Sequence, residues 1–122
     1  MTVVVEPTVP GSKDPVVPHA GPGDLWFVLG ELKFSGNYAA GGEIKLSEEI
    51  ESALKQVGTG KILWLDVQGD AKGFIFAFNY ETGKLQIYQT GAALKGKLEE
   101  LPAGALPAEI TGAKVRVFAI GR

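Results

Sequence analysis

The chain has 122 residues, the length of a single domain that can bury a hydrophobic core without crosslinks. Its net charge is −2, with 12 basic residues scattered among 14 acidic ones, which excludes the basic surface that nucleic-acid binding requires. It contains no cysteine and a single histidine, His19, which excludes disulfides, thiolate chemistry and a Ser-His-Asp triad.

Neither a membrane span nor an export signal is expected. No segment approaches the ~20 consecutive apolar residues of a membrane helix. The N-terminal sequence MTVVVEPTVPG has neither the basic start nor the long apolar core of a signal peptide. We therefore expect a soluble protein with no membrane partner that does not use the general secretory route.

Residues 1–22 differ in composition from the rest of the chain, because five of the seven prolines lie there. Proline fixes φ, lacks an amide N–H and biases the preceding residue toward extended conformations, so we expect an extended N-terminal arm. Its valines make the arm too apolar for a solvated linker, which favours docking along its own surface or a neighbour's over a disordered leader. The candidate interface residues of this arm are Val3, Val4, Val5, Val9, Val16 and Val17.

Residues 23–122 are expected to form one β-rich domain that begins with a strand over residues 25–34. The first half of this strand is continuously apolar, whereas the second half alternates apolar and charged residues. This pattern predicts a strand whose first half is buried and whose second half is half-exposed. Gly30, in the middle of the strand, is the expected position of a bulge.

The sequence FSGNYAAGGE, residues 34–43, follows as a glycine-rich loop. We interpret it as a structural corner in which Gly41 and Gly42 adopt backbone angles that let the chain leave the strand. Tyr38 is expected either to hold this corner by packing or to be an exposed contact for a neighbouring subunit. It is therefore the remaining candidate interface residue.

A helix is predicted for residues 47–58. Ser47 is a suitable N-cap, the acidic residues after it complement the helix dipole, and Gly58 is a typical stop. The apolar stripe at helical spacing consists of Ile50, Ala53, Leu54 and Val57.

Residues 61–67 are predicted to form a strand that ends in a polar turn. Residues 73–80 and 84–89 then alternate around Glu81-Thr82-Gly83, which is the strongest hairpin signal in the chain. The aromatic side chains of this hairpin that we expect to face the core are Phe74, Phe76, Phe78 and Tyr80.

Residues 91–112 are rich in glycine and alanine, and they are expected to form a long irregular connection with one short helical turn. Residues 114–120 are predicted to form the last strand, with Val115, Val117 and Ala119 on one side. Five strands and one helix without βα alternation predict a mainly β fold. We expect a small antiparallel β-sandwich or barrel-like domain with one short α-helix and an extended proline-rich N-terminal arm.

Four patterns that could indicate a ligand site are better explained otherwise. GAALKGKL, residues 91–98, has the spacing of a phosphate loop but lacks its Ser or Thr. The glutamates at 43–51 suit a helix N-terminus, and Asp66 and Asp70 flank a turn without the ligand pattern of a calcium loop. The aromatic stripe lacks the basic residues that accompany nucleic-acid stacking. We therefore predict no catalytic residue, no cofactor and no metal, and not an enzyme.

Several short motifs resemble those of small structural proteins that decorate or cement the heads of tailed bacteriophages. They are YAAGGE at residues 38–43, GFIFAFNY at 73–80, GKLQIY at 83–88 and the terminal VRVFAIG at 115–121. The resemblance covers residues 25–122 and excludes the proline-rich arm.

The resemblance implies a structural virion protein, synthesised in the host cytoplasm, that sits on the capsid surface. It implies two partners, the major capsid protein and the chain itself as a homotrimer. The function expected from it is to bridge major capsid protein subunits, and repeated shared contacts on a lattice would strengthen weak single ones.

A second hypothesis is a non-catalytic carbohydrate- or peptide-binding β module of a tail or surface protein. The location of the surplus aromatic residues discriminates between the two hypotheses. Exposure of Trp26, Trp64, Tyr38 and Tyr88 on one common face would favour ligand binding, whereas their burial would favour the structural role.

Overall fold

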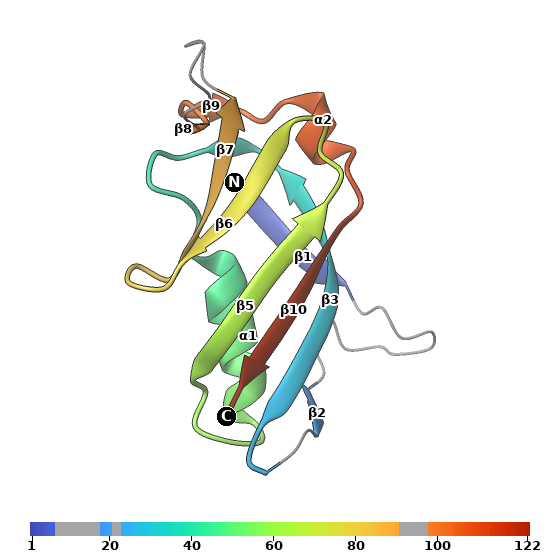
Figure 1. The fold of residues 1–122 in the computed structure, drawn as a ribbon, viewed down its shortest axis with the longest axis vertical. Helices are drawn as coiled ribbons and strands as arrows, with labels where there is room; N and C mark the ends of the chain where they lie inside the picture. Colours follow the sequence, from blue (N-terminus) through green and yellow to red (C-terminus); the bar gives the residue numbers. More distant parts are fainter. Residues whose placement is uncertain (7–17, 21–22, 91–97) are drawn as a thin grey trace.

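The computed structural model describes residues 1–6, 18–20, 23–90 and 98–122 (Figure 1). The described part is mainly β, with antiparallel sheets and one helix of 11 residues, which confirms the predicted fold class. The strands are β1 Thr2–Glu6, β2 Pro18–Ala20, β3 Trp26–Ser35, β4 Asn37–Tyr38, β5 Ile62–Gly69, β6 Phe74–Asn79, β7 Lys84–Thr90, β8 Leu98–Glu100, β9 Gly104–Ala105 and β10 Val115–Gly121. The helices are α1 Lys45–Lys55 and α2 Ala108–Thr111.

The larger sheet has the strand order β1-β3-β10-β5, and β2 pairs with β3 as well. All pairs are antiparallel, and alternate residues of β3, β5 and β10, together with Val3 and Val5 of β1, face the core. In β10 the buried side is Val115, Val117 and Ala119, as predicted. The core residues that this sheet contributes are Val3, Val5, Val28, Leu32, Phe34, Leu65, Val67, Val115, Val117 and Ala119.

The predicted hairpin is confirmed as β6 and β7, and β8 adds a third strand to it. Phe74, Phe76 and Phe78 are partly buried against the core, and the ring of Phe76 stacks on Phe34 at 5.3 Å. The fourth aromatic residue, Tyr80, lies beyond the end of β6 and is 56% exposed. The prediction that all four rings face the core is therefore wrong for Tyr80.

Helix α1 begins two residues earlier than predicted, with Ile44 at its N-cap position. The assignment of Ser47 as N-cap is wrong, because Ser47 is buried inside the first turn. Its Oγ lies 3.0 Å from the carbonyl oxygen of Ile44 and 2.7 Å from that of Gly83, so its hydroxyl joins the helix to the β6–β7 turn. Val57, expected on the apolar stripe, lies beyond the end of the helix and is exposed.

The first described residues of the chain form a strand of the larger sheet. β1 pairs with β3 from Thr2↔Ser35 to Glu6↔Glu31, and Val3 and Val5 are buried in the core. These residues are extended and lie along the chain's own sheet, where Val3 and Val5 complete the core. Of the rest of the expected arm, residues 18–20 form β2, and residues 7–17 and 21–22, which include the candidate interface residues Val9, Val16 and Val17, lie outside the described residues.

Two further local expectations are wrong. Gly30 is not a bulge, since it pairs with Val117 in a continuous register, and the irregularity of this sheet lies instead between Ile120 and Gly121 on the β5 side. Strand β5 also continues through Gly69, so the polar turn begins after that residue. In the connection expected over 91–112, residues 98–112 contain β8, β9 and α2, and residues 91–97 lie outside the described residues.

Candidate interaction surface

The larger sheet has a second face that no described element covers. In Figure 1, α1 lies behind β5 and β10, so this face is turned toward the viewer. Its side chains alternate with the core residues of the same strands, so they point away from the core. We call these residues the outer face: Phe27, Leu29 and Glu31 of β3, Arg116, Phe118 and Ile120 of β10, and Trp64, Asp66 and Gln68 of β5.

The register groups the apolar side chains at one end of the outer face. Phe27 lies opposite Ile120, which lies opposite Trp64, and the next row contains Leu29 and Phe118. The rings of Phe27 and Phe118 are 5.8 Å apart and tilted by 38°. Trp64 is 56% exposed, Leu29 40% and Phe118 36%, so three large apolar side chains contact solvent on one surface. Contiguous exposed apolar surface of this kind marks interaction sites.

The opposite end of the outer face is polar. Arg116 lies between Glu31 and Gln68 in the register, and Gln68 Nε2 donates a 2.8 Å hydrogen bond to Asp66. A hollow of about 310 Å³ opens here, with Leu29 and Phe118 among the residues that line it. Arg116 makes no ion pair with any other described residue, which leaves its guanidinium available to a partner.

A second hollow, of about 750 Å³, lies where β3 begins and α1 ends. Its walls include Trp26, Val57 and Lys61. The main-chain groups of Lys61 and Arg122 bond to each other at 2.9 and 3.0 Å, so they are not free to hold a ligand. We therefore assign the interaction surface to the outer face, where the exposed apolar side chains gather.

Tyr38, the candidate contact from the glycine-rich loop, is in the core. It is 2% exposed, and its hydroxyl donates a 2.6 Å hydrogen bond to Oε1 of Glu100 and accepts one from the backbone N–H of Ile87 at 3.2 Å. The same Oε1 accepts a 2.7 Å bond from the backbone N–H of Gly41. Tyr38 therefore holds the corner of residues 34–43, and it is not an exposed contact for a neighbouring subunit.

This environment gives the stability a pH dependence. Burial raises the pKa of the Tyr38 hydroxyl well above its ordinary value, and the hydrogen bond to Glu100 raises it further. In the unfolded chain the hydroxyl ionises near pH ~10, so below that pH both states keep the proton. Above it only the folded state does, and the free energy of unfolding falls by at most about 1.4 kcal/mol per pH unit.

We therefore expect urea unfolding to show a loss of stability above a pH of about 10 that is smaller in Tyr38→Phe than in the wild type. Both proteins keep all other ionisable groups, so the difference reports Tyr38. An equal loss in the two proteins would contradict this assignment.

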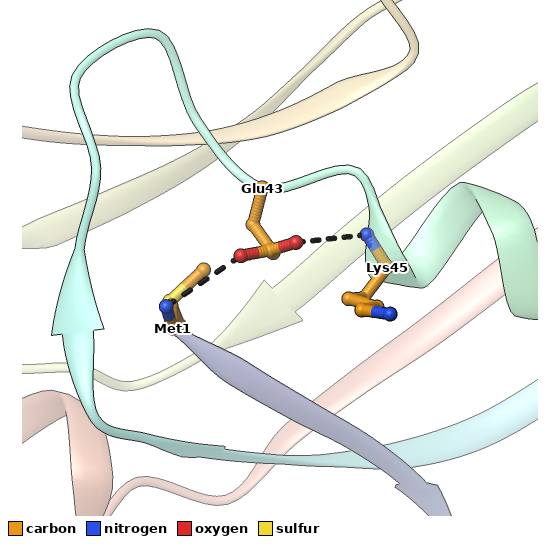
Figure 2. A network of polar contacts seen from close by, with 3 residues as sticks. All are labelled: Met1, Glu43 and Lys45. Carbon is orange, nitrogen blue, oxygen red and sulfur yellow. Dashed lines mark hydrogen bonds and ion pairs between the residues drawn. The ribbon is translucent and has the colours of Figure 1, made fainter.

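Glu43 connects the corner to the start of the chain and to α1. Figure 2 shows its carboxylate between the N-terminal ammonium of Met1, at 3.5 Å, and the backbone N–H of Lys45, at 3.1 Å. Its main chain also pairs with Leu85, through bonds of 2.9 and 2.8 Å. The carboxylate that could have belonged to an acid cluster thus joins the start of the chain to α1, and the Glu43 main chain adds the contact to β7.

The substitution Gly42→Ala is expected to destabilise the protein more than Gly41→Ala. Both glycines have positive φ, +104° and +90°, a strain of roughly 1–3 kcal/mol for an alanine. A Cβ on Gly42 would in addition collide with the carbonyl oxygen of Leu85, whereas one on Gly41 meets nothing within 4 Å. Denaturant unfolding of the two variants checks this, and equal losses would show that the close approach to Leu85 is not limiting.

The aromatic residues that discriminate between the two hypotheses do not share a face. Trp64 is on the outer face, Tyr38 is buried, and Trp26 is partly buried against the core. Tyr88 lies on the second sheet, with its hydroxyl donating to Gln86 at 2.9 Å. These four residues are neither exposed together nor all buried, so their location favours neither hypothesis. Trp64 is the one member of the group on the outer face.

Three further observations concern the described ranges. They contain no group of three or more His, Cys, Asp or Glu side chains that could hold a metal ion. Burial raises the pKa of Glu49, and the nearby Lys45 partly opposes this shift. None of the helices in the same ranges is long and apolar enough to cross a membrane.

Comparison of the chain with protein-family models, with curated proteins and with solved structures found no match. The outer face and the short sequence motifs are therefore the features of this chain that bear on its function.

Proposed function

We propose that this chain is a structural virion protein that decorates or cements a phage capsid by bridging major capsid protein subunits. The observation that carries the proposal is the outer face, where Trp64, Leu29 and Phe118 are exposed together on a rigid sheet. Large aromatic anchors of this type dominate the energy of protein interfaces. The proposed partner, the major capsid protein, is taken from the resemblance of the short motifs to those of phage head proteins.

The outer face has the composition of a protein-binding surface. Its apolar end is aromatic and aliphatic, and Arg116, Glu31 and Gln68 form a polar margin at the other end, so it combines the apolar contacts and polar margin of protein interfaces. On a capsid, each weak contact would be repeated across the lattice, so modest affinity per subunit suffices. A homotrimer on the capsid surface, assembled after synthesis in the host cytoplasm, is part of this proposal.

A second candidate is a carbohydrate- or peptide-binding module that uses the same face. The hollow favours it, because Arg116, Asp66 and Gln68 supply hydrogen-bonding groups beside the ring of Phe118. This second candidate has less support, because a ligand-binding face would gather several aromatic side chains. Trp64 is the single tryptophan on the outer face, whereas Tyr38 is buried and Trp26 is partly buried against the core.

Gene context and binding together test the proposal. We expect the gene to lie beside one for a major capsid protein, and the purified chain to co-sediment with capsids assembled from that protein. We also expect a solution mass of three chains. A glycan array run in parallel distinguishes the second candidate, which predicts hits there and none on capsids. A monomeric chain that never joins capsids would refute the proposal.

A further inference from the structure

One edge of β5 is bonded to a tyrosine hydroxyl instead of to a strand. Within the described ranges β5 pairs with β10 on one side, and no strand pairs with its other side. On that side the backbone N–H of Leu65 donates to the hydroxyl of Tyr80 at 3.0 Å, and the same hydroxyl lies 3.2 Å from the Leu65 carbonyl oxygen, to which it donates. Tyr80 thus satisfies the two groups that a neighbouring strand would use.

The backbone N–H and C=O of Leu65 indicate which other main-chain groups of β5 point toward this edge. Since they are bonded to Tyr80, the pair Leu65↔Ala119 is a non-hydrogen-bonded pair of the antiparallel ladder. By the two-residue repeat, the pair Val67↔Val117 is of the same type, so the N–H and C=O of Val67 also point away from β10. No hydrogen bond between described residues outside the ladders uses either group of Val67.

Strand β6 is the neighbour on this side, but it does not complete the sheet. A short turn connects β5 to β6, and the two strands belong to different sheets (Figure 1). Tyr80 lies in the turn after β6, and its side chain places its hydroxyl against the main-chain groups of Leu65.

The Tyr80 side chain, which blocks this edge of β5, is weakly held. Tyr80 is 56% exposed, and its ring meets Phe78 edge to face at 5.0 Å. Its attachment to β5 consists of the two hydroxyl bonds, each of which contributes little net free energy because water competes for both groups. Edge strands of natural proteins are commonly blocked against unwanted pairing by such local devices.

We propose that the edge of β5 at Leu65 and Val67 is an acceptor site for an extended polypeptide strand, and that the Tyr80 hydroxyl keeps it closed. An extended backbone is the partner because it presents donors and acceptors at the two-residue spacing of the edge. Asp66, which lies between these residues and points to the outer face, selects a strand with a basic residue opposite it. This proposal goes beyond the proposed function and does not depend on it.

The test compares the wild type with Tyr80→Phe, using Tyr88→Phe as the matched control, because the Tyr88 hydroxyl bonds to a side chain away from this edge. The probe is a fluorescent peptide with the sequence of residues 114–121, KVRVFAIG, which carries two basic residues and already pairs with β5 on its other side. A peptide with proline in place of the central valine is the negative probe, because it lacks the N–H that the ladder needs.

We expect Tyr80→Phe to bind the peptide about tenfold more tightly than the wild type, since two hydrogen bonds no longer compete with it. Tyr88→Phe should bind like the wild type, and the proline peptide should not bind any variant. A folded Tyr80→Phe protein that binds no better than the wild type would overturn the proposal.

Hydrogen exchange of the wild type tests, without a bound peptide, whether the edge of β5 is free at Val67. The Leu65 amide should be protected and the Val67 amide should exchange rapidly, and in Tyr80→Phe the exchange of Leu65 should rise by about tenfold or more. If Val67 is as protected as Leu65 in the wild type, the edge is not free and the proposal is wrong.

Discussion

Replacing Tyr38 by alanine is expected to lower the free energy of unfolding by about 3–5 kcal/mol, the cost of deleting a buried aromatic ring from a core. The loss is large because the ring is 2% exposed and its hydroxyl bonds both Glu100 and the main chain of Ile87. A domain of this size has a total stability of about 5–15 kcal/mol, so much of it would be lost. Urea or thermal unfolding of the purified variant measures the effect.

Two milder variants separate the ring from the hydroxyl. Tyr38→Phe keeps the ring and leaves the Ile87 N–H without its partner, so we expect a loss of about 1–3 kcal/mol. Tyr88→Phe removes a partly buried hydroxyl that bonds a single side chain, and should cost less than about 1 kcal/mol. Equal costs for these two would mean that the Tyr38 hydroxyl does not hold the corner.

The second large effect is expected on binding rather than on stability. Trp64→Glu should weaken association with capsids by about 30-fold or more, because a large aromatic anchor contributes about 2 kcal/mol or more and the new charge must be desolvated. Its stability should change by less than about 1 kcal/mol, since the side chain is 56% exposed. A binding isotherm from co-sedimentation, with unfolding curves alongside, measures both quantities.

Ile75→Glu is the matched control for this variant. Ile75 is 48% exposed, but it lies in β6 of the second sheet, away from the outer face. We therefore expect the Ile75→Glu protein to bind capsids like the wild type. Weakened binding by both variants would indicate a general effect of added charge, and weakened binding by Ile75→Glu alone would move the interface to the second sheet.

Local patterns in the sequence were sufficient for the fold class, the hairpin and the last strand. Each of these depends on residues close in sequence: the alternation around Gly83, for example, specifies both the turn and the two faces of β6 and β7. The wrong predictions concern residues whose position depends on contacts with residues distant in sequence. Ser47 lies inside α1 with its Oγ 2.7 Å from the carbonyl oxygen of Gly83, and no local rule indicates that contact.

The assignment of β1 to the larger sheet could not be predicted from its composition. The triplet Val3-Val4-Val5 is continuously apolar, so its alternation of buried and exposed positions becomes visible only when β3 lies beside it. Nearby prolines led to the expectation of an arm, although they begin only after the strand ends. Pairing partner and register, which are tertiary information, decide the state of these residues.

The outer face was missed for a related reason, although a signal for it existed. Strands that are apolar on both sides, such as ILWL in β5, predict burial on both sides when read alone. In this molecule one side of the sheet packs on the core and the other has no cover, so Trp64 and Phe118 remain exposed. An apolar residue at an outward position is thus a sign of an interface once the sheet order is known.

Footprinting the chain on capsids is the most direct test of whether the outer face is the docking surface. Hydroxyl radicals oxidise exposed Trp64 and Phe118 in the free chain, and the exposed Ile75 provides the internal reference. Capsid binding is expected to slow oxidation of Trp64 and Phe118 and to leave that of Ile75 unchanged. Oxidation of Trp64 and Phe118 at the free-chain rate in the capsid-bound protein would show that the outer face is not the docking surface.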